Sequence, residues 1–517
     1  MKLVNTLSAL AIASALALPL SSGIAQTAEP SAGGELTVAI DLQPKSLDPG
    51  FGDADTIDRY LFNQMYEPLI RLDAEGDIVP VLATDYAFSD ENDAIRFTLR
   101  EGVTFHDGTP FDAAAVKFNI ERILDESSGS TRRQDVADVA SVEVVSDSEV
   151  LVTLNGPSGA ALSGFAAEGT LMVSPTAVEE HGEDYGRNPV GTGPFRFVAW
   201  PGGERVELEK YADYWQDDEA GNDLPYLDKL TVRTIKNYAT ALLELESGNV
   251  DALDVVNTQD FERLEGNESV ALVPTPQVTN LMIALNVSKP PFNDKRVRQA
   301  LAQSVDREIL AKAVAGESGT VTPTFLPPSD WAYDESLKGW GHDPEGAKAL
   351  LEEASAADLA FQLLIIQREP DATVGQFVQQ MMKSSGISVD LQILERQSWI
   401  DRVLVNKDFE AAMLRGNFPR IDPHASYGRF FWNQGSSNNW VLHENQAVFD
   451  LIDEARATTD LDERKTLYSE LGASLLDESY MVWLFNRPAM QAARTNVKDI
   501  GQDVGGAWVF TRTWLER

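Results

Sequence analysis

Apolar and polar residues alternate along several short stretches, and this two-residue period predicts half-buried β-strands. The stretch 95–100 (IRFTLR) shows it most clearly, and 35–40 (ELTVAI) is a second strand-like run. Residues 69–73 and 78–89 have the composition of strands joined by turns, whereas 56–66 resembles a helix. The N-terminal part of the chain is therefore predicted to mix strands with a helix.

A helix is predicted soon after the strand at 95–100. A turn at 106–110 (HDGTP) leads to Asp112, a residue type that accepts hydrogen bonds from the first backbone N–H groups of a helix. The apolar residues of the buried helix face follow: Val116, Ile120, and Ile123 or Leu124.

The region 361–393 has the pattern of a β-α-β unit. Residues 361–366 (FQLLII) form a continuous apolar run, as expected of a strand covered on both faces. Gly386 ends the helix that follows, and 387–393 alternates as the next strand. The apolar stripe of that helix consists of Val374, Phe377, Val378, Met381 and Met382. A short helix at 398–406 and a strand at 409–414 suggest a second crossover.

Two arginines lie at or next to the ends of these strands. Ligands of open α/β sheets bind beyond the carboxyl ends of the strands. Here those positions are the loop 367–373, which contains Arg368, and the stretch that begins at Arg415. We therefore expect both arginines on the wall of a binding site.

The stretch 414–432 (LRGNFPRIDPHASYGRFFW) combines arginines with aromatic residues. Its prolines and glycines predict a loop rather than a helix or strand. Guanidinium forks bind carboxylates, and rings offer stacking faces, so the stretch suits small-molecule recognition. The alternative is a structural loop whose rings fill a core. The residues concerned are Arg415, Phe418, Arg420, Tyr427, Arg429, Phe430, Phe431 and Trp432.

Length and charge narrow the functional classes. The 517 residues suffice for two to four domains. With 42 Lys and Arg against 81 Asp and Glu, the net charge is −39, which repels nucleic acid and anionic membranes. We therefore expect no nucleic-acid partner and no direct membrane insertion.

The N-terminus has the pattern of a secretory signal peptide. Lys2 precedes an apolar run at 7–20, and small residues favour cleavage after Ala25, so the signal peptide is predicted at 1–25. The run is short for a membrane span. The chain has no cysteine, which excludes disulfides and a lipidated cysteine at the cleavage site. We expect a free periplasmic protein.

No arrangement of residues predicts catalysis or a cofactor. The five histidines are scattered, and H-E-x-x-H, G-x-S-x-G, P-loop and G-x-G-x-x-G motifs are missing from the sequence. We therefore expect no enzyme, no cofactor and no resident metal. We interpret the pair His106 and Asp107 as structural, and keep contact of His424 and His443 with a metal complex as an alternative.

Five segments in order resemble the solute-binding proteins of peptide-type ABC transporters, family 5. They are 95–123 (with GVTFHDGTPFDAAAV), 188–200 (NPVGTGPFRFVAW), 289–310 (KPPFNDKRVRQALAQSVDREIL), 342–354 (HDPEGAKALLEEA) and 480–488 (YMVWLFNRP). Ala115 stands where the family commonly carries an acid. The resemblance spans the mature chain.

The resemblance implies an α/β fold of the periplasmic-binding-protein type, with two lobes and three domains. Domain I would comprise 33–48, 173–280 and 486–517. Domain II would be an insertion at 49–172, and domain III would be 281–485. The chain would cross between the lobes near Asn280 and Asn486, and the lobes would close around a ligand by a hinge motion.

The resemblance also implies candidate ligand contacts. In dipeptide-binding relatives an arginine after a domain III strand pairs with the ligand carboxylate, and Gln367 and Arg368 match that position. The alternative is an arginine paired with Glu369 or Asp371. The expected contacts are Phe51, Gln367, Arg368, Arg415, Asn417, Phe418, Arg420, Asp422, Trp432 and Trp440.

The ligand class follows from one departure from the family pattern. The relatives hold the ligand amine with an aspartate before a D-P pair; the pair here is Asp422–Pro423, and Pro419 stands at the aspartate position. This favours an opine, a modified peptide or another anionic solute. An ordinary di- or oligopeptide stays open. So does an oligosaccharide bound by Asn417, Asn438, Asn439, Trp432 and Trp440; Trp399 fits a core better than a binding wall.

The partners implied are a small-molecule ligand and an ABC permease in the inner membrane, and we expect a monomer. Two rival interpretations remain. A secreted hydrolase using paired carboxylates would turn its ligand over. A sensory protein of the same fold would present the ligand to a membrane receptor.

Overall fold

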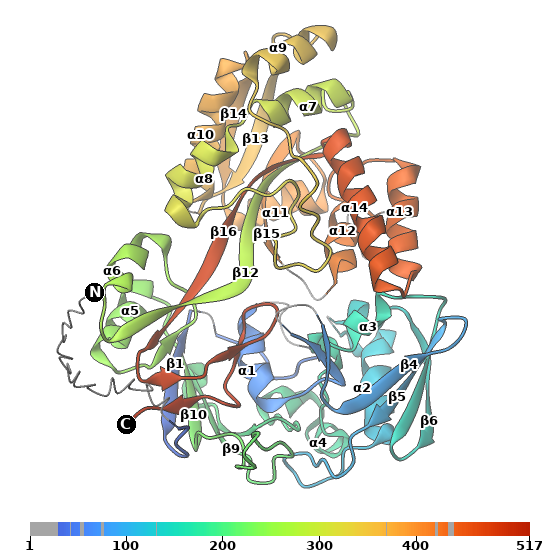
Figure 1. Ribbon diagram of the computed structural model, residues 1–517, viewed down its shortest axis with the longest axis vertical. Coiled ribbons are helices and arrows are strands. Elements are labelled where there is room, and N and C mark those ends of the chain that lie inside the picture. Colours follow the sequence, from blue (N-terminus) through green and yellow to red (C-terminus); the bar gives the residue numbers. More distant parts are fainter. Residues whose placement is uncertain are drawn as a thin grey trace, which may run out of the picture.

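The computed structural model describes residues 29–41, 43–51, 56–73, 77–130, 132–368, 370–418, 422–432 and 439–517. The predicted signal peptide lies outside these ranges. Figure 1 shows two lobes, one above the other, joined by two long strands that run between them. No helix of the described residues is long and apolar enough to cross a membrane.

One mixed ten-stranded sheet runs through both lobes, in the order β14-β13-β15-β12-β16-β11-β1-β10-β9-β8. Its strands are β1 (Glu35–Ile40), β8 (Phe195–Ala199), β9 (Arg205–Lys210), β10 (Lys229–Thr234), β11 (Ala252–Leu253), β12 (Val270–Leu285), β13 (Ala360–Ile366), β14 (Ser388–Leu394), β15 (Ala411–Phe418) and β16 (Met481–Arg494). β14, β13 and β15 are parallel to one another, and β15 is antiparallel to β12.

Smaller sheets belong to the lower lobe. A four-stranded antiparallel sheet comprises β4 (Ala83–Phe88), β5 (Ala94–Leu99), β7 (Glu149–Leu154) and β6 (Val139–Ser146). The two-stranded sheets are β2 (Ile70–Leu72) with β3 (Ile78–Pro80), β17 (Val497–Lys498) with β20 (Trp514–Leu515), and β18 (Gly501–Gln502) with β19 (Trp508–Val509).

The helices divide between the two lobes in the same way. Those of the lower lobe are α1 (Thr56–Met65), α2 (Ala113–Leu124), α3 (Ala161–Gly164), α4 (Pro175–His181), α5 (Tyr238–Ser247) and α6 (Phe261–Glu265). Those of the upper lobe are α7 (Lys295–Gln303), α8 (Arg307–Ala315), α9 (Pro344–Glu353), α10 (Asp371–Ser384), α11 (Arg396–Ile400), α12 (Pro423–Phe431), α13 (Gln446–Ala457) and α14 (Leu461–Glu478).

The antiparallel pair β12 and β16 forms the crossing between the lobes (Figure 1). The pairing runs from Val270 opposite Arg494 to Ala284 opposite Met481, and it is interrupted between Pro274 and Val278. Asn280 lies opposite Asn486, and its Nδ2 donates to the Asn486 Oδ1 at 2.7 Å. The two positions predicted for the crossings are therefore in direct contact.

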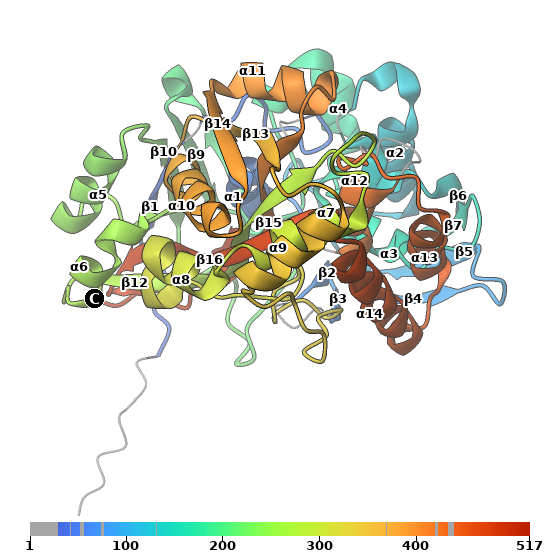
Figure 2. The same ribbon diagram turned by 90° about the horizontal axis from the view of Figure 1, so that it is seen from above.

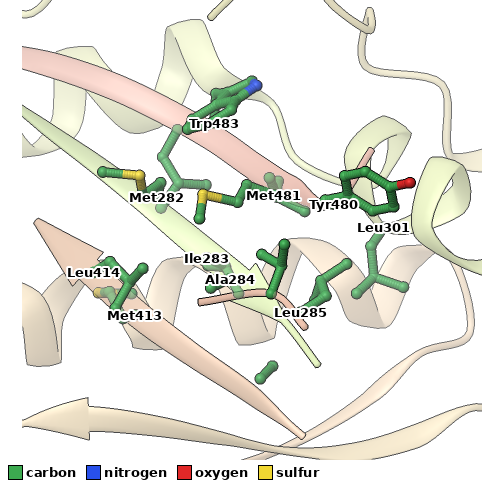
Figure 3. Close-up of a cluster of buried hydrophobic side chains, with 14 of the residues drawn as sticks. Met282, Ile283, Ala284, Leu285, Leu301, Met413, Leu414, Tyr480, Met481 and Trp483 are labelled. Atoms are coloured by element: carbon green, nitrogen blue, oxygen red, sulfur yellow. The ribbon is translucent and has the colours of Figure 1, made fainter. Parts of the chain in front are cut away.

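Separate apolar clusters support the two lobes. The upper cluster contains buried residues between Leu281 and Phe485 (Figure 3). In the lower lobe one cluster surrounds β1 and α1, and another lies between the β4–β7 sheet and α2. Because α1 packs with β1, residues 56–65 share a core with segments predicted as domain I, although they fall inside the predicted range 49–172. The domain boundaries stay a prediction.

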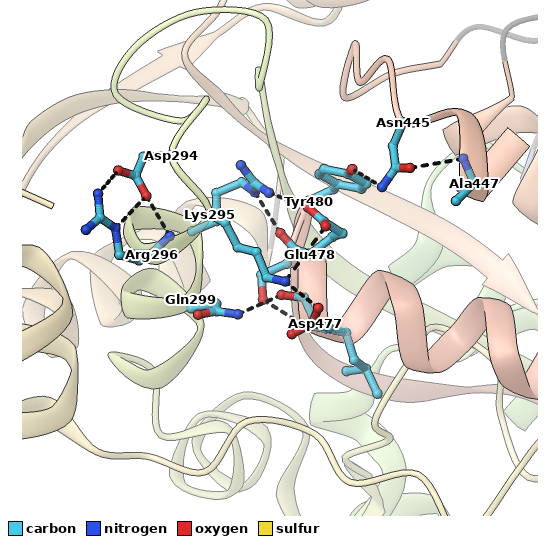
Figure 4. A network of polar contacts seen from close by, with 12 residues as sticks. Asp294, Lys295, Arg296, Gln299, Asn445, Ala447, Asp477, Glu478 and Tyr480 are labelled. Atoms are coloured by element: carbon cyan, nitrogen blue, oxygen red, sulfur yellow. Dashed lines mark hydrogen bonds and ion pairs between the residues drawn. The ribbon is translucent and has the colours of Figure 1, made fainter. Parts of the chain in front are cut away.

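A polar network fastens α7 to the end of α14 (Figure 4). Arg298 Nη2 donates to Glu478 Oε2 at 2.8 Å, Lys295 pairs with Asp477, and Gln299 Nε2 donates to the Asp477 carbonyl at 2.8 Å. Arg298 is almost fully buried, so the network anchors α7 from inside the lobe.

Most of the predicted elements are confirmed. β1, β5, α1, α2, β13, α10 and β14 lie where the periodicity placed them, and Asp112 caps α2 by accepting from the Ala115 N–H at 2.9 Å. The short helix predicted at 398–406 is α11 followed by a π-helical turn at Asp401–Val405.

The interpretation of 414–432 as a loop is wrong. β15 extends to Phe418, and α12 occupies Pro423–Phe431. Asp422 caps this helix by accepting from the His424 N–H at 2.8 Å, and Pro423 fits the first helical position because no hydrogen bond is required of its nitrogen there. Pro423, one of the residues taken as breakers, is therefore part of a helix-start signal, whereas Gly416 lies in β15 and Gly428 lies inside α12.

Candidate functional site

Two arginines share one buried carboxylate at the ends of β13 and β15. Arg368 Nε lies 2.7 Å from Asp371 Oδ2, and Arg415 Nε lies 2.5 Å from Asp371 Oδ1. The side chain of Asp371 is only 1% exposed, whereas those of Arg368 and Arg415 are 39% and 18% exposed. The carboxylate lies beneath the arginines and holds both guanidiniums, which face outward more than it does.

Strand order explains why these residues meet. β13 and β15 are parallel neighbours, so their carboxyl ends lie at the same edge of the sheet. Asp371 is the first residue of α10, whose N-terminal backbone dipoles add positive potential. The sequence analysis predicted Arg368 and Arg415 at this edge of the sheet. It also gave an ion pair between Arg368 and Asp371 as the alternative to a ligand contact, and the structure shows that ion pair.

Burial lowers the pKa of the Arg415 guanidinium to about 10. Asp371 opposes this shift by favouring the charged form, whereas the positive charges of Arg368 and Arg487 lower the pKa of Arg415 further. Burial disfavours the charged form of this guanidinium, and an anionic ligand beside it would stabilise that form.

A row of polar side chains crosses the sheet beside this cluster. Asn417 on β15 and Arg487 on β16 both lie opposite Thr279 on β12, so the three side chains share one face. Arg415 is two residues before Asn417 and shares that face as well. Thr279 Oγ1 donates to Asn417 Oδ1 at 3.0 Å.

Arg487 was missed from the sequence, as was the role of Asp371 in joining two arginines. The available signal for Arg487 was its position directly after Asn486, at a predicted crossing between the lobes. An arginine at a crossing faces the space that the lobes enclose or the solvent behind it, and sequence periodicity does not distinguish these.

The other predicted contacts within or near this loop region are only partly described. Gln367 is exposed, and its backbone N–H donates to the Leu394 carbonyl at 2.7 Å. Phe418 ends β15. Arg420, Pro419 and Asn438 lie outside the described residues, so the argument from Pro419 stays a prediction.

Asp422 is fully engaged inside the upper lobe. Both of its carboxylate oxygens accept from Arg464 Nη2 at 2.9 Å, and Tyr468 Oη lies 3.3 Å away. Asp422 is 5% exposed and Arg464 is 3% exposed. This buried ion pair positions α12 against α14, which is a structural role for Asp422.

The predicted aromatic contacts are also packed against neighbours. Trp440 is buried, with its ring centroid 5.2 Å from Phe430. Trp432 is partly buried beside the rings of α12, and Trp399 lies in the upper core, as expected. Phe51 stacks under the Arg122 guanidinium at 4.5 Å. None of these rings is joined to the arginine cluster by a contact among the described residues.

Of the two histidines considered as metal contacts, His443 is buried and His424 is partly buried. Among the described residues, no group of three or more His, Asp or Glu side chains could hold a metal ion. His106, whose Nε2 lies 2.9 Å from the Gly193 carbonyl, joins the 106–110 turn to the 188–200 segment, in agreement with a structural role.

Burial lowers the pKa of His443 to about 4. Its Nδ1 accepts from the Asn445 N–H at 3.1 Å and its Nε2 donates to the Phe431 carbonyl at 2.7 Å, so the neutral ring satisfies both contacts. An unfolded histidine binds its proton near pH 6.5, so His443 is expected to contribute less stability as the pH falls from about 6.5 to about 4.

A His443→Gln variant lacks this titration. The melting-temperature advantage of the wild type over the variant is therefore expected to shrink across that window. An advantage that does not change with pH would contradict the prediction.

Comparison with known proteins decides the family. The model of the bacterial extracellular solute-binding proteins, family 5 (middle region), matches residues 77–438, well over half of the chain. This chain belongs to that family. The family 5 protein is similar to the glutathione-binding protein GsiB of Salmonella paratyphi A, with 30% identity over 511 residues and 96% of each chain covered.

Solved structures show the same fold for the family 5 protein. The periplasmic binding protein DppA of Helicobacter pylori, in complex with the peptide STSA, has a TM-score of 0.78 and 24% identity, with 94% of this chain and 99% of that chain covered. AgaA of A. tumefaciens R10, in complex with agropinic acid, has a TM-score of 0.76 and 24% identity over 94% and 99%. The predicted two-lobed α/β fold is confirmed.

The predicted functional class is confirmed as well. The family 5 protein is a member of a family of extracellular solute-binding proteins, and a curated relative is named for the binding of a small solute.

Proposed function

We propose that the family 5 protein captures a small anionic, peptide-like solute between its lobes and delivers it to an ABC permease. The observation that carries this proposal is the pair Arg368 and Arg415 held by the buried Asp371. Two guanidinium forks at the carboxyl ends of neighbouring parallel strands suit a carboxylate. A relative named for glutathione binding and a neighbour solved with agropinic acid, an opine, support this ligand class.

Asp371 holds both arginines in position before a ligand binds. Each of its oxygens engages a different arginine, so the two guanidiniums lose less side-chain freedom on binding than two unrestrained arginines would. Closure of the lobes by a twist of β12 and β16 would then exclude water and strengthen the charge-assisted hydrogen bonds. No covalent step is needed.

The setting follows from the same proposal. The chain would work as a monomer in the periplasm after cleavage behind Ala25, without a lipid anchor. An ordinary peptide is the second candidate ligand, because DppA is solved with one. A sugar stacked on Trp440 is less favoured, since that ring is buried against Phe430.

The decisive experiment compares arginine variants in calorimetric titrations with glutathione, agropinic acid and a neutral-side-chain tetrapeptide. Arg415→Met and Arg368→Met are each expected to weaken binding of the acidic ligands by at least about tenfold, roughly the worth of one charge-assisted hydrogen bond. Arg368 is the more exposed of the two, so its variant separates binding from folding effects.

Arg396→Met is the matched control, because Arg396 is exposed at the start of α11. It should bind as the wild type does. Unchanged affinity of both cluster variants would refute the site, and preference for the tetrapeptide would refute the ligand class.

A further inference from the structure

Arg487 is a half-buried arginine whose guanidinium makes no hydrogen bond or ion pair with any described residue. It lies on β16 at the crossing between the lobes, one residue after Asn486. Burial lowers the pKa of Arg487, and the charge of Asp371 only partly opposes this. A guanidinium that is partly buried and not paired to a described residue can accept a hydrogen-bonding anion without first giving up another partner.

Both carboxylate oxygens of Asp371, the acid that interacts with Arg487, already bind other arginines. Asp371 gives one oxygen to Arg368 and the other to Arg415. Arg487 lies within electrostatic range of this cluster, since its positive charge lowers the pKa of Arg415.

The row beside Arg487 also offers donors. The Asn417 Oδ1 accepts from the Thr279 hydroxyl, whereas the Asn417 amide hydrogens bond to no described residue. Arg487 and Asn417 flank Thr279 on one face, so their free donors face the same space. An acceptor supplied from outside the chain would satisfy both.

Spacing separates this row from the Asp371 cluster. β15 and β16 lie on either side of β12, so their backbones are about 10 Å apart, and Arg415 lies a further step of about 7 Å along its strand. Arg415 is drawn toward α10 by Asp371, whereas Arg487 is free to extend from β16. This geometry fits two anionic groups of one solute better than a single group.

We infer that Arg487, with Asn417, forms a second anion position, so that the preferred ligands are peptide-sized solutes with two carboxylates. This inference rests on the proposed function, because the first anionic group occupies the Arg368 and Arg415 position. A dicarboxylate with its carboxyl groups several bonds apart, as in a γ-linked or acidic small peptide, would fill both positions. Arg487 then selects ligands with two carboxylates over ligands with one.

The test uses matched ligands that differ in one carboxylate. Glutathione is compared with its glycyl monoethyl ester, and Ala-Glu with Ala-Gln, on the wild type, Arg487→Met, Arg487→Lys and Arg396→Met. The wild type and Arg396→Met are expected to prefer each dicarboxylate by at least tenfold. Arg487→Met should bind the monocarboxylates as the wild type does and lose the preference, and Arg487→Lys should recover part of it.

The outcomes distinguish this inference from the proposed function. Binding of monocarboxylates and dicarboxylates with equal affinity by the wild type would overturn the second anion position alone. Equal weakening of both ligands by Arg487→Met, with an unchanged melting temperature, would also overturn it. Failure of the wild type to bind any of the four ligands would overturn the proposed function, and this inference with it.

Discussion

A Gly159→Val variant is expected to lose at least tenfold in ligand affinity, because the lobes touch at this residue. A Cβ atom at Gly159 would lie 1.8 Å from the Thr458 carbonyl oxygen, which belongs to the opposite lobe. Both views place α13 and α14 beside α3 and the β4–β7 sheet (Figures 1 and 2). A backbone atom cannot move aside as a flexible side chain can, so valine would hold this edge open.

Polar contacts surround Gly159 and show how close the approach is. The Ala160 N–H donates to the Arg456 carbonyl at 3.2 Å, Arg456 pairs with Asp138, and Ser158 Oγ donates to Asp138 Oδ2 at 2.7 Å. The ion pair is partly exposed and is worth no more than about 1 kcal/mol. The steric change at Gly159 is therefore the stronger perturbation of closure.

The measurement combines titration with small-angle scattering. In saturating ligand, Gly159→Val should keep a larger radius of gyration than the wild type. Gly156→Val is the matched control, since a Cβ atom there meets nothing within 4 Å. If both valine variants bind and scatter as the wild type does, contact at this edge is not part of the ligand-bound state.

An Arg464→Met variant is expected to lower the free energy of unfolding by about 3–5 kcal/mol, because it leaves a buried carboxylate without its cation. Arg464 donates to both oxygens of Asp422 and, through Nε, to the Ala455 carbonyl at 2.9 Å. The loss should appear in equilibrium denaturation of the upper lobe.

Lys465→Met is the control for this change, since Lys465 is the exposed neighbour and should shift stability by less than about 0.5 kcal/mol. Adding Asp422→Asn to Arg464→Met should cost less than the sum of the two single changes. Additive losses would show that the pair is not coupled. Ligand affinity that falls in Asp422→Asn without loss of stability would return Asp422 to the binding site.

Sequence periodicity predicted the elements that are regular over many residues. The buried run at 361–366 and the stripe of α10 identify a β-α-β unit, and the parallel order of β13 and β15 brings Arg368 to Arg415. Local patterns were enough to predict this proximity, because the carboxyl ends of neighbouring parallel strands lie at the same sheet edge regardless of the sequence that connects the strands. The proximity of Arg368 and Arg415 could therefore be predicted from the sequence.

The remainder depends on contacts that are distant in sequence. Arg487 joins the row only because β16 pairs with β12 across 208 residues, from Thr279 to Arg487. Asp371 could be assigned to a helix start, but its choice of two arginine partners depends on side-chain packing. The loop prediction at 414–432 failed because Pro423 was counted as a breaker without its capping residue, Asp422.

Because β12 and β16 connect the two lobes, opening and closing of the lobes can be followed with a single distance measurement. β12 and β16 are hydrogen-bonded to each other on both sides of the interruption at Pro274–Val278, so the lobes cannot slide apart or exchange partners. The pairing is irregular at Pro274–Val278 and again at Leu281–Met282, so rotation of one lobe against the other is expected at these segments. A single dye pair, one on each lobe, should report the entire movement as one coordinate, and the cysteine-free chain lets both dyes be attached at chosen positions.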